Sequence, residues 1–315
     1  MTLTASEPLG AGTAPPHETV PPVKLWLCPN DALPPAIAAV LASHWLDERE
    51  HATAARFLFE RDRRQYLVAH TLVRRALALE AGLAESELVI WRSSRGRPFL
   101  QPSPGGLPRG GDHLDFNLSH AGGYSLLGIV RTQRIGVDVE GLGREAGALE
   151  TILTTFTPEE QRWAADAPPG RQRDRRVLRL WTLKEAYSKA RGLGLGLPFD
   201  EFSFCLADDR GVLGFRPPAD DRAGRWRFLE LEPVPDVLAA VAVPADEGCA
   251  PHLELHQGFP WDRSAPHTVV LPEPVGPPPD PSDPRPGPRG REKSTRAASL
   301  SAVSKAEPES RVQFQ

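Results

Sequence analysis

Three acidic side chains of this 315-residue chain could together hold a metal ion. Asp138 and Glu140 belong to the segment IGVDVE, and the two-residue period of a strand puts both on one face. Two neighbouring carboxylates repel each other unless a cation lies between them. Glu185 is the third, and all-oxygen ligation is what Mg²⁺ prefers. An alternative stays open, in which Asp138 and Glu140 form the solvent-facing side of a half-exposed strand.

Glu185 is followed by a basic residue at helical spacing. In WTLKEAYSK, Glu185 and Lys189 stand four positions apart and therefore share a helix face with Trp181. Such a pair often does no more than support an exposed helix. The run Gly192-Leu193-Gly194-Leu195-Gly196 that follows favours a close approach of the backbone to a ligand, because one glycine would suffice to end a helix.

Arginines and one polar loop supply candidate anion-binding groups. Guanidinium groups bind phosphate with two parallel hydrogen bonds, and isolated arginines are otherwise solvated surface charges. The segment FNLSHAGG adds Ser119 and His120, which as strand neighbours point to opposite faces and cannot form a catalytic dyad. The chain has no GxSxG or GxxxxGK[ST] motif, which argues against a serine hydrolase and a P-loop NTPase. The arginines are Arg61, Arg74, Arg75, Arg92, Arg95 and Arg97.

Helices are expected where start and stop signals frame an apolar period. Asp62 and Gln65 match a capping box, and helical spacing continues to a stop at Gly82. Thr157, followed by proline and glutamates, predicts a second helix start. Val177–Arg191 predicts a long helix that ends at the glycine run.

Strands are expected between these helices. The apolar runs 124–130 and 135–140 are separated by four polar residues, which predicts an antiparallel hairpin. Further strands are expected at 88–91, 202–206 and 226–231, and 237–243 is expected to close the body.

Composition limits the class of protein. Hydrophobic residues make up 40% and charged residues 25%, and the net charge of −4 argues against a general nucleic-acid binder. Three separated cysteines, without a CxxC pair, argue against a disulfide framework or a zinc site. No signal-peptide pattern or apolar run of about 20 residues is present, so a cytoplasmic protein without membrane contact is expected.

The composition also divides the chain. We expect a flexible tail over 1–22, an N-terminal α+β half over 23–130 and a C-terminal α+β half over 131–260. The proline-rich segment 264–315 is expected to be disordered, because it cannot bury enough apolar surface to offset its ordering entropy.

Six segments in order resemble the 4′-phosphopantetheinyl transferases of the surfactin-synthetase-activating type. The segments run from Phe59 to Pro198 and read FERDRRQYL, SSRGRPFL, FNLSHAGG, IGVDVE, FTPEE and WTLKEAYSKARGLGLGLP. The resemblance implies an α+β fold of two similar subdomains, arranged as a pseudo-twofold fused dimer with coenzyme A in the cleft between them. It implies transfer of the phosphopantetheine arm of coenzyme A to a serine of an apo acyl or peptidyl carrier protein, with release of adenosine 3′,5′-bisphosphate.

The resemblance also implies roles for residues. Asp138, Glu140 and Glu185 would hold Mg²⁺, and Lys189 would meet the pyrophosphate. Glu185 is the first candidate to accept the serine proton, directly or through a metal-bound water. The segment Gly96-Arg97-Pro98 has arginine where many members have lysine. The positions that match coenzyme A contacts are Arg61, Arg92, Arg97, Ser119 and His120.

A monomer is expected, since the two halves would already form the cleft. Carrier proteins are acidic around the serine-bearing helix, so a basic run before the metal helix could steer them. A solvated loop and helix start is the alternative for this run, which comprises Arg171, Arg173, Arg175, Arg176 and Arg179. Two other functions compete: an inactive relative that only binds coenzyme A or carrier, and a Mg²⁺-dependent nucleotide-diphosphate hydrolase.

Overall fold

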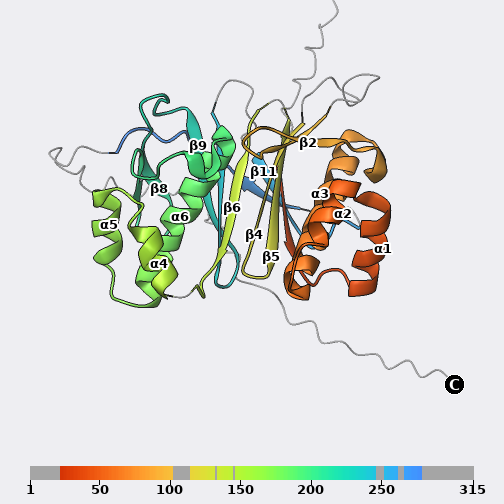
Figure 1. Ribbon diagram of the computed structural model, residues 1–315. Helices are drawn as coiled ribbons and strands as arrows, with labels where there is room; N and C mark the ends of the chain where they lie inside the picture. Colours follow the sequence, from red (N-terminus) through yellow and green to blue (C-terminus); the bar gives the residue numbers. More distant parts are fainter. Residues whose placement is uncertain are drawn as a thin grey trace, which may run out of the picture.

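The protein has two β-sheets that lie face to face between two groups of helices (Figure 1). The computed structural model describes residues 22–101, 114–131, 133–144, 146–245, 252–261 and 266–278. The helices are α1 (Pro35–Trp45), α2 (Glu48–Ala54), α3 (Glu60–Ala81), α4 (Ala146–Leu153), α5 (Pro158–Ala165) and α6 (Arg171–Arg191), with short 3-10 turns at Glu85–Glu87 and Gly194–Gly196.

The larger sheet has the strand order β12-β11-β1-β5-β4 and the second has the order β6-β10-β9. The remaining strands form two small antiparallel hairpins, β2-β3 and β7-β8. The strands are β1 (Val23–Pro29), β2 (Ile90–Arg92), β3 (Pro98–Leu100), β4 (Leu114–Ala121), β5 (Tyr124–Arg131), β6 (Gly136–Gly141), β7 (Ser203–Leu206), β8 (Val212–Arg216), β9 (Trp226–Val234), β10 (Val237–Pro244), β11 (His252–Gln257) and β12 (His267–Val270).

Strand alternation explains the layers. In β1, Leu25 and Leu27 belong to the core between the sheets, whereas Trp26 belongs to the core under α3. In β10, Val241 belongs to the same inter-sheet core, whereas Ala240 belongs to the core under α6. Both sheets are therefore apolar on two faces and buried between a helical layer and each other, in the order helix, sheet, sheet, helix.

The two longest helices end where the sequence predicts, although α6 begins at Arg171, six residues before the predicted start at Val177. Gly82 ends α3 and Gly192 ends α6, each in the left-handed region that favours glycine. The Thr157 capping box at the start of α5 is confirmed. The capping box predicted at Asp62 is wrong, because α3 begins at Glu60 after Phe59, and the Asp62 side chain pairs with Arg61.

The predicted hairpin of residues 124–130 and 135–140 is also wrong. Strand β5 pairs with β4 and β1, whereas β6 pairs with β10 in the other sheet. A Cβ at Gly128 would lie 2.6 Å from Ile135 Cδ1 and 2.7 Å from Val137 Cγ1. The side chains of β6 therefore pack onto the face of β5, which is possible only because Gly128 has no side chain of its own.

The C-terminal segment corrects two expectations. Strand β10 does not close the body, because β11 returns to the larger sheet and pairs in parallel with β1. Residues 266–278, expected to be disordered, contain β12 and bury Leu271 and Val275. The prediction was wrong because it was made from the average composition of 264–315, in which the prolines outweigh the short apolar segment around β12. Of the tails expected over 1–22 and 264–315, residues 1–21, 264–265 and 279–315 lie outside the described residues. No helix in the described part is long and apolar enough to cross a membrane.

Candidate active site

The metal candidates on β6 are buried beside α6. Val137 and Val139 belong to the inter-sheet core, so Asp138 and Glu140 share the opposite face, as predicted. Asp138 is 3% exposed and Glu140 is 4% exposed, which contradicts the alternative of a solvent-facing strand. A Cβ at Gly136 would lie 1.9 Å from the Ala186 carbonyl oxygen, so β6 and α6 touch along their backbones.

Asp138 joins the two halves of the protein. Its Oδ1 accepts hydrogen bonds from Ser119 Oγ at 2.7 Å and from Lys189 Nζ at 2.6 Å. Ser119 comes from β4 of the larger sheet, and Lys189 comes from the last turn of α6. Asp138 Oδ2 is buried and has no hydrogen-bond partner among the described residues. A buried carboxylate oxygen without a partner is costly and is suited to receive a ligand.

Glu140 is held by groups that follow it in the chain. Arg144 donates to both carboxylate oxygens, with Nε at 2.9 Å from Oε2. Trp181 Nε1 donates to Oε1 at 3.0 Å. Burial and the neighbouring Asp138 raise the pKa of Glu140, while the Arg144 hydrogen bonds oppose this shift.

Glu185 lies on the α6 face that turns toward β6. It is 8% exposed, and its Oε2 is 3.9 Å from Lys189 Nζ. Burial raises the pKa of Glu185 to about 7, with Lys189 opposing and the two β6 carboxylates adding to the rise. A carboxyl group with a pKa near neutrality can accept or donate a proton under physiological conditions.

The three carboxylates fit a magnesium ion in part. No group of three or more His, Cys, Asp or Glu side chains in the described segments is arranged to hold a metal. Asp138 has a free buried oxygen, and Glu185 has no hydrogen-bond donor within the described residues. Glu140 could join them only after Arg144 releases it. Carboxylate oxygens are the ligand type that Mg²⁺ prefers, and Asp138 and Glu185 are the two carboxylates here that are not bonded to an arginine.

His120, Arg61 and Arg92 are anion candidates of the N-terminal half. His120 Nδ1 is 2.6 Å from Gln65 Nε2 of α3, and burial lowers the pKa of His120, which favours the neutral imidazole. Arg61 and Arg92 are exposed; Arg61 pairs with the adjacent Asp62, and Arg92 Nη1 donates to the Gly96 carbonyl oxygen at 3.0 Å. Both guanidinium groups are therefore accessible to a ligand.

Arg97 has a different environment from the one predicted. It is 7% exposed, and its Nη2 donates to Asp115 Oδ2 and to the Ile135 carbonyl oxygen. Its Nη1 donates to the carbonyl oxygen of Lys189. These partners occupy both terminal nitrogens, so Arg97, which directly precedes β3, connects this part of the chain to the end of α6. Of its N–H groups, only the buried Nε has no partner among the described residues, so little of the guanidinium group is left to bind an anion.

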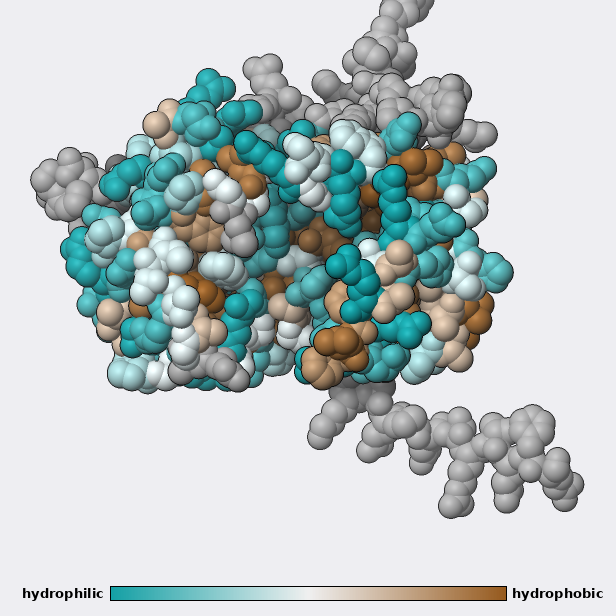
Figure 2. All heavy atoms as spheres, in the orientation of Figure 1, coloured by the Kyte–Doolittle hydropathy of each residue, from teal (hydrophilic) through white to brown (hydrophobic). Residues whose placement is uncertain are grey.

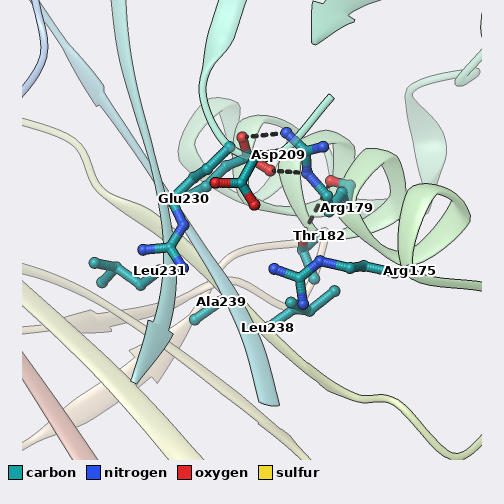
Figure 3. A pocket seen from close by; sticks show the side chains of 9 residues that line it. Arg175, Arg179, Thr182, Asp209, Glu230, Leu231, Leu238 and Ala239 are labelled. Carbon is teal, nitrogen blue, oxygen red and sulfur yellow. Dashed lines mark hydrogen bonds and ion pairs between the residues drawn. The ribbon is translucent and has the colours of Figure 1, made fainter. Parts of the chain in front are cut away.

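The basic run at the start of α6 is neutralised within the protein. Figure 3 shows Arg179 forming two parallel bonds to Glu230, at 2.8 and 2.9 Å, beside a cavity of about 10 Å³ that has room for one water molecule. Each arginine of the run forms an ion pair, with the partners Asp236 for Arg171, Glu150 for Arg173, Glu232 for Arg175, Asp208 for Arg176 and Glu230 for Arg179. The structure therefore favours the alternative to a carrier-steering surface.

Lys184 is a buried residue that sequence reasoning missed. Its Nζ donates to the carbonyl oxygens of Phe199 and Phe202 and pairs with Glu160 at 2.9 Å. Burial lowers the pKa of Lys184 to about 8. The side chain fixes the segment after α6 to α5. The sequence did offer one signal: neighbours in a helix point about 100° apart, so Lys184 cannot lie on the same helix face as Glu185.

Comparisons with known proteins cover both halves. A model described as the 4′-phosphopantetheinyl transferase superfamily matches residues 134–242, and one described as 4′-phosphopantetheinyl transferase, N-terminal, matches residues 34–130. A phosphopantetheinyl transferase of a Thraustochytrium species is 31% identical over 65% of this chain and 73% of its own length. The 4′-phosphopantetheinyl transferase HetI of a Nostoc species is 31% identical over 70% of this chain and 87% of its own.

Among solved structures, a holo-(acyl-carrier-protein) synthase from Bacillus anthracis in complex with CoA aligns with a TM-score of 0.30. That alignment has 21% identity and covers 35% of this chain and 94% of the synthase. The two family models cover the segments that carry the buried carboxylates, Lys189 and the α3 start. The chain therefore belongs to the 4′-phosphopantetheinyl transferase superfamily.

Proposed function

We propose that this protein transfers the 4′-phosphopantetheine group of coenzyme A to a serine of an apo carrier protein, with Mg²⁺ as its cofactor. Family membership supports the reaction class. The observation that carries the proposal is the convergence of Ser119, Asp138 and Lys189, which brings both halves of the chain to one buried carboxylate. Lys189 and Glu185 lie beside it, on one face of α6.

The reaction is a phosphoryl transfer. The serine oxygen of the carrier bonds to the β-phosphorus of coenzyme A, and the bond from that phosphorus to the bridging pyrophosphate oxygen breaks. Adenosine 3′,5′-bisphosphate leaves with the bridging oxygen, and the serine proton goes to Glu185, directly or through a water molecule. Positioning and charge neutralisation supply most of the acceleration in such reactions.

Each side chain has a role that its environment supports. Lys189 Nζ neutralises charge on the pyrophosphate, and Arg61 and Arg92 bind phosphate oxygens from the N-terminal half. Gln65 Nε2 hydrogen-bonds His120 Nδ1 and so fixes the imidazole ring, which leaves His120 Nε2 to face the ligand. Arg97 is not part of this set, because its terminal nitrogens are bonded within the protein.

Asp138, Glu185 and, once it is released from Arg144, Glu140 would hold Mg²⁺. Bound there, the ion would supply positive charge that stabilises the leaving group. One chain contains every residue of this set, so we propose a monomer. The cytoplasm, where coenzyme A and carrier proteins occur together, is the proposed location.

Intact mass spectrometry of an apo carrier tests the proposal. The carrier is incubated with the protein, coenzyme A and Mg²⁺, and we expect a mass gain of one phosphopantetheine group. EDTA or Glu185→Gln should abolish that gain while the protein stays folded. Failure with several acyl and peptidyl carriers, despite measurable coenzyme A binding, would favour an inactive relative. Release of free phosphopantetheine without carrier would favour the hydrolase.

A further inference from the structure

An exposed hydrophobic ridge lies at the start of α3, outside the set of residues described above. We define the ridge as Phe57, Leu58 and Phe59, whose exposed fractions are 39%, 94% and 67%. The Phe57 ring packs at 5.4 Å from the Tyr66 ring of α3, which anchors the ridge from behind. Leu58 and Phe59 have no such partner within the described part of the chain. Large apolar side chains exposed next to each other commonly mark an interaction surface.

Free positive charge surrounds the ridge. Arg56 and Arg63 are exposed, and their side chains form no hydrogen bond or ion pair with the described residues. From 56 to 64 the chain has four arginines against one glutamate and one aspartate, a net charge of +2, whereas the whole chain has a net charge of −4. The five arginines at the start of α6 are instead all paired with carboxylates. The region around the ridge is therefore attractive to an acidic partner.

The ridge is close to the buried carboxylate cluster. Gln65 contacts His120, the neighbour of Ser119, and Gln65 lies only five residues after the first residue of α3, or about 8 Å along the helix axis. Figure 1 shows the start of α3 and the turn between β4 and β5 at the same lower end of the molecule. Figure 2 shows hydrophobic side chains grouped at the lower edge of the half formed by α1, α2 and α3, with hydrophilic ones around them.

We infer that the ridge and its flanking arginines dock the carrier protein, through an acidic helix with apolar side chains. This inference rests on the proposed function, since a partner that must present its serine to the cluster has to bind at the cluster's margin. Apolar contact with Leu58 and Phe59 supplies affinity, and Arg56 and Arg63 supply long-range attraction. The ridge replaces the α6 arginines as the carrier-docking surface.

Steady-state kinetics with the full-length protein and an apo acyl carrier tests the inference. We expect Leu58→Ser combined with Phe59→Ser to raise the KM for carrier about tenfold, because two exposed apolar contacts are lost. Coenzyme A affinity, measured by calorimetry with Mg²⁺, should not change. Leu213→Ser is the matched control, since Leu213 is 59% exposed on β8 and should leave the KM for carrier unchanged.

A charge series separates attraction from contact. Arg56→Gln combined with Arg63→Gln should raise the KM for carrier at low salt, and the difference should shrink as salt increases. Arg173→Gln, in the neutralised run, should have no such effect.

Three results would overturn the inference: an unchanged KM for carrier in the ridge variant, an equal rise in the Leu213 control, or a ridge variant that alters only self-association in sedimentation. A wild-type protein that modifies no carrier would refute the proposed function instead, and is recognised before any variant is made.

Discussion

Replacement of Arg97 by methionine discriminates between two roles for this residue. The sequence predicts contact with coenzyme A, whereas the structure buries the guanidinium group against Asp115, whose side chain is 1% exposed. Arg97→Met would remove the nearest cation of that buried carboxylate and leave it with Arg134, whose Nη1 is 3.9 Å from Asp115 Oδ1. Removing one partner of a buried ion pair costs about 3–5 kcal/mol. For a domain of this size, each kcal/mol lowers the Tm by about 2–4 °C, so we expect a decrease of about 10 °C.

A double-mutant cycle tests whether the cost comes from Asp115. Asp115→Asn keeps an oxygen that can accept the Ile135 N–H, now bonded at 3.0 Å to Asp115 Oδ2, and removes the negative charge. The double variant should recover most of the stability that Arg97→Met loses, because the uncompensated charge is gone. Arg97→Lys should retain the charge but lose the fork that reaches Asp115 and Ile135 together.

Urea unfolding and calorimetric coenzyme A binding provide the two measurements. The structural role predicts a large loss in the free energy of unfolding, and restoration of both stability and coenzyme A affinity in the double variant. A variant that unfolds within about 1 kcal/mol of the wild type but no longer binds coenzyme A would refute this reasoning. In that case the guanidinium group would contact the ligand, as the sequence pattern predicts.

Three further predictions concern stability and the helix α6. Burial alone would raise the pKa of Glu50, but hydrogen bonds and nearby cations lower it to about 2 from an ordinary value of 4.5. The ionised Glu50 carboxylate therefore stabilises the folded protein by about 3 kcal/mol above pH 4.5, and this stabilisation is lost as the pH falls toward 2. When the free energy of unfolding is measured against pH, Glu50→Gln should lose less stability on acidification than the wild type does. Gly136→Ala should unfold the protein or abolish transfer, because its Cβ would lie 1.9 Å from the Ala186 carbonyl oxygen; normal activity and Tm would contradict the backbone contact. Lys184→Met should lower the Tm by about 6 °C or more with unchanged coenzyme A affinity, since it leaves a buried carboxylate without its cation. Lys189→Met should lower the Tm for the same reason and should also weaken coenzyme A binding; thermal shift and calorimetry separate the two variants.

Local signals in the sequence predicted the elements that carry the site. The glycine stops after α3 and α6 and the alternation around Asp138 depend only on neighbouring residues, and they were sufficient to place the carboxylates on one face. Sheet membership could not be obtained this way. Strand β6 packs on the face of β5 because Gly128 leaves room for the Ile135 side chain. A contact between the faces of two sheets does not change the alternation of apolar and polar residues along either strand, so the sequence could not show it.

The ion pairs that neutralise the α6 arginines could not be predicted from the sequence either. The α6 arginines find carboxylates 23 to 65 residues away in the chain, so the run reads as basic although the folded surface is paired. Arg97 meets Asp115 and the end of α6 for the same reason, at separations of 18 and 92 residues. A sequence motif shows which residue types are present. Whether an arginine in it contacts a ligand or a buried carboxylate depends on the three-dimensional fold.

The strand order makes the junction of the two halves a rigid support. Strand β11 follows the C-terminal sheet in the chain yet pairs with β1, so separating the halves would require breaking hydrogen bonds within the larger sheet. Arg97 and Asp138 add polar links across the same junction, to the carbonyl of Lys189 and to Ser119. A site placed there holds its carboxylates in position before any substrate arrives. Adaptation to coenzyme A and carrier must then come from exposed side chains at the margin, which is where the unpaired arginines and the hydrophobic ridge lie.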